Sequence, residues 1–177
     1  MPLYLVRPDL MYFERYNDMM TEWNRSGTQI APWFLGDPFP DVAAYARHVR
    51  MLDACRRTIP ESPYAATDSY YAVDGEGRLV GAASLRLYLT EEGLAAWGHI
   101  GYGVRPSERG KGTATAILRL MLGEAEKAHI REILLGAHET NAASRRVIEK
   151  SGGMLLNTVP DPNAPEKNIC RYRIMIR

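Results

Sequence analysis

The chain has 177 residues, of which 46% are hydrophobic and 24% are charged. These proportions are typical of one folded domain of ordinary size and exclude a disordered chain. Lys and Arg number 22 and Asp and Glu number 21, so the net charge is +1. This balance argues against a general nucleic-acid or membrane-surface binder, since both need a basic excess.

The two cysteines and four histidines lack the spacing of metal ligands, so the sequence predicts neither a metal site nor a disulfide framework. The N-terminal residues do not resemble a signal peptide, and no stretch approaches 18 consecutive apolar residues. We therefore expect a single domain over residues 1–177, located in the cytoplasm.

Apolar periodicity and turn residues predict the secondary structure along the chain. The pattern at residues 114–125, for example, repeats apolar side chains at helical spacing. The expected elements, in chain order, are a strand at 3–7, helices at 10–24 and 42–52, strands at 69–73, 78–89 and 97–104, a helix at 114–128, a strand at 132–136, a helix at 141–151, and strands at 154–159 and 168–176.

A glycine-rich segment just before the helix at 114–128 carries the strongest chemical signal. Gly110 and Gly112 allow the backbone to bend tightly or to approach a ligand. The N-terminus of the following helix offers unpaired N–H groups and the positive end of the helix dipole, which favour an anion. The segment therefore predicts a phosphate or pyrophosphate site. Its basic residues exceed the acidic one by two, namely Arg105, Arg109 and Lys111 against Glu108.

Two common nucleotide-binding motifs do not fit this segment. The P-loop pattern requires Ser or Thr where Gly112 stands, and it requires Gly where Arg105 stands. The dinucleotide fingerprint requires a third glycine where Thr115 stands. The segment is therefore expected to bind phosphate through a motif other than the P-loop or the dinucleotide fingerprint.

Residues 109–114, with the sequence RGKGTA, resemble the R/Q-x-x-G-x-G/A motif of the GNAT superfamily of N-acetyltransferases. Residues 104–109 are similar to the exit of that family's fourth strand. Residues 141–153 resemble its second signature, N-x-x-S/A-x-x-hydrophobic-x-E-K-x-G-F. A predicted helix and strand separate the two signatures, as in the family. The chain is similar in particular to a bacterial branch of predicted acetyltransferases.

The resemblance implies an α/β (α+β) domain whose mixed, mostly antiparallel central sheet has six or seven strands and about four flanking helices. It also implies transfer of an acetyl group from acetyl-CoA, bound as co-substrate, directly to a primary amine of a small molecule or to an exposed protein amine. By their positions in the motifs, the residues expected to bind acetyl-CoA are Tyr102, Gly103, Val104, Arg109, Gly110, Lys111, Gly112, Thr113, Ala114, Asn141 and Ser144.

The resemblance is less informative about which residues donate and accept protons in the reaction. Many members carry Tyr where Ile148 stands, so Ser144 is the candidate general acid. His99 is the candidate base because imidazole titrates near neutral pH. Strand alternation, however, places His99 opposite the face that usually carries the base, unless a bulge shifts the register. Further candidates for the base or the acceptor site are Glu91, Glu92 and Tyr172.

Two other functions stay open on the sequence alone. One is a non-catalytic module that binds or senses acyl-CoA, which the absence of Tyr at Ile148 allows. The other is a structural subunit of a dimer. The apolar strand at 170–176 could pair with a second copy, so a homodimer is considered, while nucleic acid and membranes are not expected partners. The acceptor site is expected in the loops at 27–40 and 58–68, which do not identify the amine.

Overall fold

The structure is a computed structural model that describes residues 2–58, 62, 64–91 and 93–176. None of its helices within these residues has the length and apolar character needed to cross a bilayer. The strands are β1 (Leu3–Val6), β2 (Thr67–Asp74), β3 (Leu79–Arg86), β4 (Ile100–Val104), β5 (Glu132–His138), β6 (Met154–Asp161) and β7 (Ala164–Met175). The helices are α1 (Phe13–Ser26), α2 (Val42–Cys55), α3 (Thr113–Lys127) and α4 (Ala142–Lys150), with a π-helix at Gly93–Trp97 and 3₁₀ turns at Leu10–Tyr12 and Pro106–Glu108.

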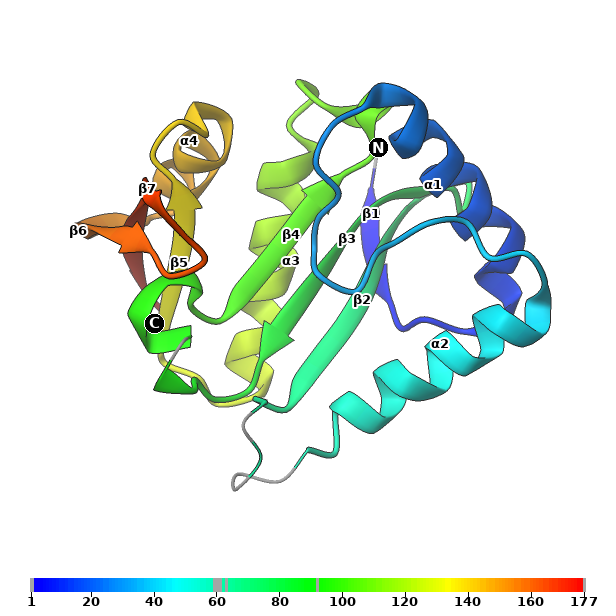
Figure 1. The fold of residues 1–177 in the computed structure, drawn as a ribbon, viewed down its shortest axis with the longest axis horizontal. Coiled ribbons are helices and arrows are strands. Elements are labelled where there is room, and N and C mark those ends of the chain that lie inside the picture. Colours follow the sequence, from blue (N-terminus) through cyan, green and yellow to red (C-terminus); the bar gives the residue numbers. More distant parts are fainter. Residues whose placement is uncertain (1, 59–61, 63, 92, 177) are drawn as a thin grey trace.

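The strands form two antiparallel sheets that diverge from each other (Figure 1). One has the order β1-β2-β3-β4 and the other the order β5-β7-β6. They meet at the bridge between Gly98 and Leu135, where the His99 N–H donates to the Leu134 carbonyl at 2.7 Å. The predicted fold class is confirmed, and the predicted central sheet is split between β4 and β5.

Two hydrophobic cores cover the opposite faces of the first sheet, because side chains alternate along each strand. On β2, Tyr70 and Ala72 face the core that contains α3, whereas Tyr71 and Val73 face the core that contains α1 and α2. The apolar stripe predicted for α3 is buried at Ile117, Leu118, Met121 and Ala125, as expected.

The strand predicted at 97–104 begins later, at Ile100. Residues 93–97 form a π-helix instead, and Gly98 follows it with φ +70°. A Cβ atom on Gly98 would lie 2.1 Å from the Leu134 carbonyl oxygen, so only glycine fits where the two sheets meet. A π-helix is rare and often marks a functional site.

The C-terminal hairpin is longer than predicted, with β6 extending to Asp161 and β7 beginning at Ala164. β6 is an edge strand, where a proline such as Pro160 costs little because edge N–H groups need not all be paired. β7 lies between β5 and β6, so both of its edges are already paired. From Cys170 to Arg173 both edges of β7 are paired within the chain, so this part of the strand predicted at 170–176 has no free edge for a second copy. The homodimer itself stays a prediction.

Candidate active site

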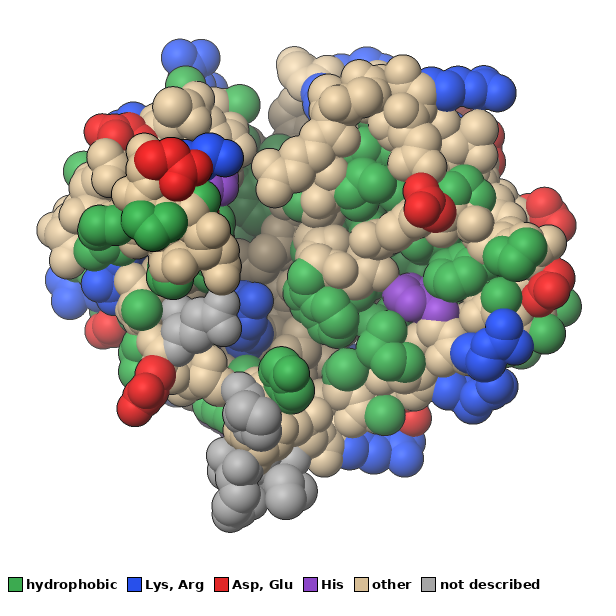
Figure 2. Space-filling view, viewed as in Figure 1, with side chains coloured by type: hydrophobic (Ala, Val, Ile, Leu, Met, Phe, Trp, Pro, Cys, Tyr) green, Lys and Arg blue, Asp and Glu red, His purple; other side chains and the backbone are tan. Residues whose placement is uncertain are grey.

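A groove of about 990 Å³ runs between the two diverging sheets. In Figure 2 it is the deep hollow between the part formed by β5, β6, β7 and α4 and the rest of the molecule. Its walls come from β4, the end of β5, the loop at 28–33 and the N-terminal turns of α3 and α4. In the described chain, the facing edges of β4 and β5 share only the Gly98–Leu135 bridge, so most of the β4 edge is available to a ligand.

Glycines on β4 let the loop at 28–33 reach the groove. A Cβ atom on Gly103 would lie 2.0 Å from the Ala31 carbonyl oxygen, and one on Gly101 would lie 3.4 Å from Pro32. The missing side chains therefore allow the loop to lie directly on the strand. This contact places the indole of Trp33 at the rim of the groove.

The N-terminus of α3 faces the groove, as the sequence predicts for an anion site. Gly110 and Gly112 have φ +75° and +84°, a backbone conformation that favours glycine. Helix α3 starts at Thr113, and its first-turn N–H groups have no partners within the helix. The groove is lined here by Arg109, Gly110, Gly112, Thr113 and Ala114.

The positive charge predicted around this loop is largely paired. The guanidinium of Arg105 is buried and contacts the carboxylates of Glu22 and Asp18 on α1. The ammonium of Lys111 lies 3.3 Å from Glu108 and 59% of its side chain is exposed. The net positive charge expected for the loop is therefore offset by α1, and the backbone N–H groups become the main anion-binding feature.

Arg109 reaches back along β4. Its guanidinium donates to the Val104 carbonyl at 3.0 Å and to the Thr28 hydroxyl at 3.0 Å, and it lies over the Trp23 ring. Further cations line the groove from α4, at Arg146 and Lys150. These positions suit the charged end of a long ligand whose other end lies deeper in the groove.

A pair of hydroxyl groups faces the groove where α4 begins. Asn141 caps α4, with its Oδ1 accepting the Ser144 N–H at 3.0 Å, as its place at the start of the helix predicted at 141–151 indicates. The Ser144 hydroxyl lies 3.0 Å from the Tyr102 hydroxyl on β4. Burial raises the pKa of Tyr102, although the bond to Ser144 opposes the shift. The phenol therefore keeps its proton at neutral pH.

His99 has a structural environment. The side chain is buried, and its ring Nδ1 accepts the Leu134 N–H at 3.0 Å. The backbone N–H of His99 donates to the Leu134 carbonyl. Burial lowers the pKa of His99, so the ring is neutral and serves as an acceptor within the junction of the sheets. It is not among the described residues that line the groove.

His138 is the groove residue that sequence reasoning missed. It ends β5 and lines the groove, and its ring packs edge-on against Trp97 with centroids 5.2 Å apart. Its Nε2 lies 3.8 Å from the buried Asp161 carboxylate, and its Nδ1 has no hydrogen-bond partner within the described residues. The sequence feature that could have identified His138 is its position three residues before Asn141.

The remaining sequence candidates lie outside the groove. Ile148 is fully buried in the core, so a tyrosine there would have to replace a packed side chain. Tyr172 is also fully buried, and its hydroxyl bonds to Glu149 and Arg145. Glu91 is exposed and does not line the groove. Glu92, the other acidic candidate, is outside the described residues.

Comparisons with known proteins agree with this geometry. A family model described as an acetyltransferase (GNAT) domain matches residues 14–154. No curated protein sequence matches the chain.

Several solved structures share the fold. One is an acetyltransferase from Salmonella typhimurium that modifies the N-terminal serine of ribosomal protein L7/L12, with 18% identity, coverage of 99% of this chain and 95% of that chain, and a TM-score of 0.68. Another is the microcin C7 self-immunity acetyltransferase MccE in complex with acetyl-CoA and AMP, with 15% identity, coverage of 98% and 92%, and a TM-score of 0.69. A third is the spermidine/spermine N-acetyltransferase SpeG from Vibrio cholerae, with 13% identity, coverage of 98% and 95%, and a TM-score of 0.63.

The structural likenesses show the shared fold, because their sequence identities are low. The family model covers most of the chain, including the loop before α3 and the whole of α4. The chain therefore belongs to the GNAT family of acetyltransferases.

Proposed function

We propose that this protein transfers the acetyl group of acetyl-CoA directly to a primary amine while both substrates are bound. The observation that carries this proposal is the groove itself. It connects an anion-binding helix N-terminus, at α3, with a pair of proton-donating hydroxyls, on Ser144 and Tyr102. These are the two features that a pyrophosphate-bearing thioester needs.

The groove suits acetyl-CoA along its length. Backbone N–H groups around Gly110, Gly112 and Thr113 would hold the pyrophosphate. The open edge of β4 would pair with the amides of the pantetheine arm, as an added strand pairs with a sheet. The MccE complex supports this assignment, since that similar fold holds acetyl-CoA.

Bound acetyl-CoA supplies a thioester whose carbonyl carbon a neutral amine can attack. Backbone N–H groups near Val104 would stabilise the negative charge that develops on the carbonyl oxygen. As the new C–N bond forms and the C–S bond breaks, the leaving thiolate takes a proton from Ser144 Oγ, which Tyr102 resupplies through their contact. The products are an amide and free CoA.

The amine must also lose a proton. His138 is the proposed acceptor, because its side chain is partly exposed and its ring lies beside Trp97 in the groove wall. Asp161 lies on the Nε2 side and would stabilise the protonated ring. Replacing His138 by Gln should lower kcat/KM at least tenfold and leave acetyl-CoA binding unchanged.

The test combines binding and turnover. Acetyl-CoA at 100 times its Kd should stabilise the protein by about 2.7 kcal/mol, and a panel of primary amines should release CoA thiol. Ser144→Ala should lower kcat about 10²-fold while acetyl-CoA still stabilises the protein. The matched control is Ser151→Ala at the other end of α4, whose hydroxyl bonds to Val147 and does not line the groove. It should keep full activity.

Two results would overturn the proposal. If acetyl-CoA neither binds nor reacts, the groove is not a CoA site. If acetyl-CoA binds tightly but no amine is acetylated, and Ser144→Ala changes nothing, the protein is instead a non-catalytic acyl-CoA-binding module. The contact between Ser144 and Tyr102 favours the catalytic function, since a purely binding module does not need a proton donor there.

A further inference from the structure

A second cavity, of about 410 Å³, adjoins the groove on the α2 side of the first sheet. Three residues, Trp33, Arg86 and Trp97, line both spaces. The cavity continues from this junction towards the C-terminal end of α2 and the start of β2. A molecule in the cavity could therefore present one end to the groove, and a volume of this size suits a small molecule.

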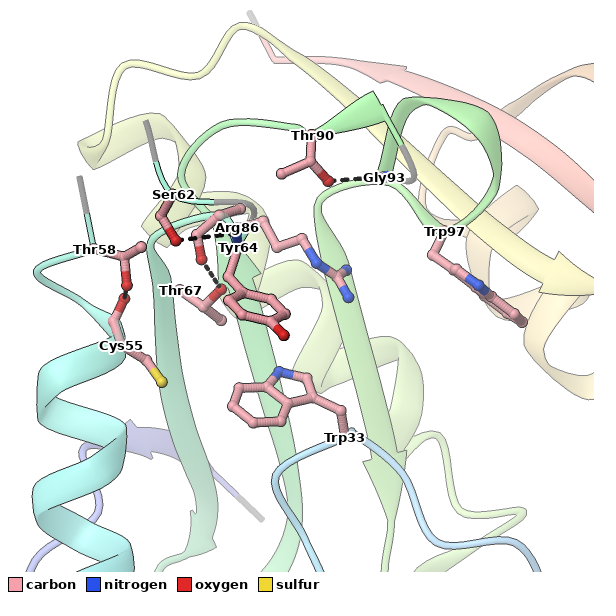
Figure 3. A pocket seen from close by; sticks show the side chains of 11 residues that line it. Trp33, Cys55, Thr58, Ser62, Tyr64, Thr67, Arg86, Thr90, Gly93 and Trp97 are labelled. Carbon is pink, nitrogen blue, oxygen red and sulfur yellow. Dashed lines mark hydrogen bonds between the residues drawn. The ribbon is translucent and has the colours of Figure 1, made fainter. Parts of the chain in front are cut away.

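Three aromatic side chains, Trp33, Tyr64 and Trp97, lie in the described wall of this cavity. Figure 3 shows Trp33 and Tyr64 beside each other and the Arg86 side chain pointing into the same space, with Trp97 farther away and its ring directed away from them. Trp33 is 51% exposed, although a large indole is normally buried. Its exposure is built into the fold, because the loop that carries it lies directly on Gly101 and Gly103 of β4.

The fold also fixes the position of Trp97. It ends the π-helix, and the next residue, Gly98, forms the bridge to β5. Its ring is held edge-on by His138. The π-helix thus fixes one indole at the junction of the two spaces, and the 28–33 loop provides another.

The groove wall also holds a buried polar group without a hydrogen-bond partner within the described residues. Ser84 lies opposite Gly101 in the pairing of β3 and β4 and lines the groove. It is 1% exposed, and its Oγ has no hydrogen-bond partner within the described residues. A buried hydroxyl usually has a partner, so a ligand group is the expected partner here. An amine placed in the groove could donate to it.

We propose that the acceptor is a small primary amine carried by an aromatic ring, with the ring in the cavity against the indole of Trp33 and the amine directed past the junction into the groove, where Ser84 lies. This inference rests on the proposed acetyltransferase function and names its substrate class. Flat rings gain stabilisation from offset or edge-on contact with aromatic side chains. The remaining described wall is neutral, with Cys55 and several threonines. The guanidinium of Arg86, the charged side chain in the described wall, donates to the Gly98 carbonyl at 2.9 Å.

The experiment measures CoA release with three acceptors, namely tryptamine, spermidine and a short peptide with an N-terminal serine. Tryptamine should have the highest kcat/KM. Trp33→Ala should lower that value roughly tenfold, which corresponds to about 1.4 kcal/mol, and Trp33→Phe should restore most of it. Cys55→Phe, which fills the cavity without reaching the groove, should abolish tryptamine turnover while acetyl-CoA still raises the melting temperature. The control, Tyr4→Ala, removes an exposed aromatic side chain on β1, away from both spaces.

Higher kcat/KM for spermidine or for the peptide would overturn the aromatic-amine inference while leaving the acetyltransferase function standing. The aromatic-amine inference is also overturned if acetyl-CoA binds but tryptamine is not acetylated, or if the Cys55→Phe variant acetylates tryptamine at the wild-type rate. A protein that does not bind acetyl-CoA would instead refute the proposed function, so the two failures are distinguishable.

Discussion

Replacing Glu22 by Gln tests how α1 holds the loop before α3. The Glu22 carboxylate accepts the Ser107 N–H through one oxygen and the buried Arg105 guanidinium through the other. Glutamine keeps one acceptor oxygen and loses the charge, so one charge-assisted hydrogen bond is lost. Such a bond contributes about 1.5–3 kcal/mol. Because the Glu22 side chain is 27% exposed, we expect a loss of about 2 kcal/mol.

The assay is thermal unfolding followed by circular dichroism. For a chain of this size, about 2 kcal/mol corresponds to a fall in Tm of roughly 4–8 °C. Asp18→Asn is the matched control, because Asp18 contacts the same guanidinium but its side chain is 66% exposed. It should cost less than about 1 kcal/mol. Equal effects of the two substitutions would refute the view that the buried contact dominates.

The pH dependence of this effect has a definite sign. Burial raises the pKa of Glu22, but the bonds from Ser107 and Arg105 outweigh it, so the pKa lies below the ordinary value of 4.5. A depressed pKa stabilises the fold above the ordinary value, and that stabilisation is lost as the pH falls through the folded-state pKa. The Tm difference between the wild type and Glu22→Gln should therefore be full at pH 7 and shrink below about pH 4.5.

Four further substitutions test other parts of the structure. Gly103→Ala places a Cβ atom against the Ala31 carbonyl and should lower stability by about 1–3 kcal/mol in urea unfolding, whereas Gly123→Ala in α3, with no atom within 4 Å, should raise stability by about 0.5–1 kcal/mol. Asn141→Ala removes the α4 cap and should cost about 1 kcal/mol in thermal unfolding; an unchanged Tm would contradict the capping role. Tyr102→Phe should lower kcat more than it raises KM for acetyl-CoA, and an unchanged kcat would remove Tyr102 from the proton path.

The sequence predicted those features that depend on neighbours along the chain. The apolar stripe of α3, the Asn141 cap and the glycines at 110 and 112 were all identified correctly. Each follows from local geometry, such as the helical repeat, a side chain that bonds three residues ahead, or a positive φ. Local signals also indicated the motif that the family model later matched.

Local patterns misjudged the region around residue 98 and the C-terminal hairpin. The apolar run at 93–97 has no period that separates a strand from a π-helix, and the strand start depends on contact with Leu134 on β5. Likewise, Pro160 reads as a loop residue, but the sheet places it on an edge strand where it is tolerated.

The composition, with 22 basic and 21 acidic residues, already argued against a polyanionic partner, and the motif at 109–114 pointed to a small anion instead. Only the tertiary structure showed that Arg105 is neutralised by Glu22, which lies 83 residues away. It alone brought Tyr102 to Ser144 and placed Trp33 and Trp97 in the wall of one cavity. The reason is physical: caps, turns and helical stripes depend on residues a few positions apart, whereas charge pairing and pocket shape depend on which surfaces the packed sheets bring together.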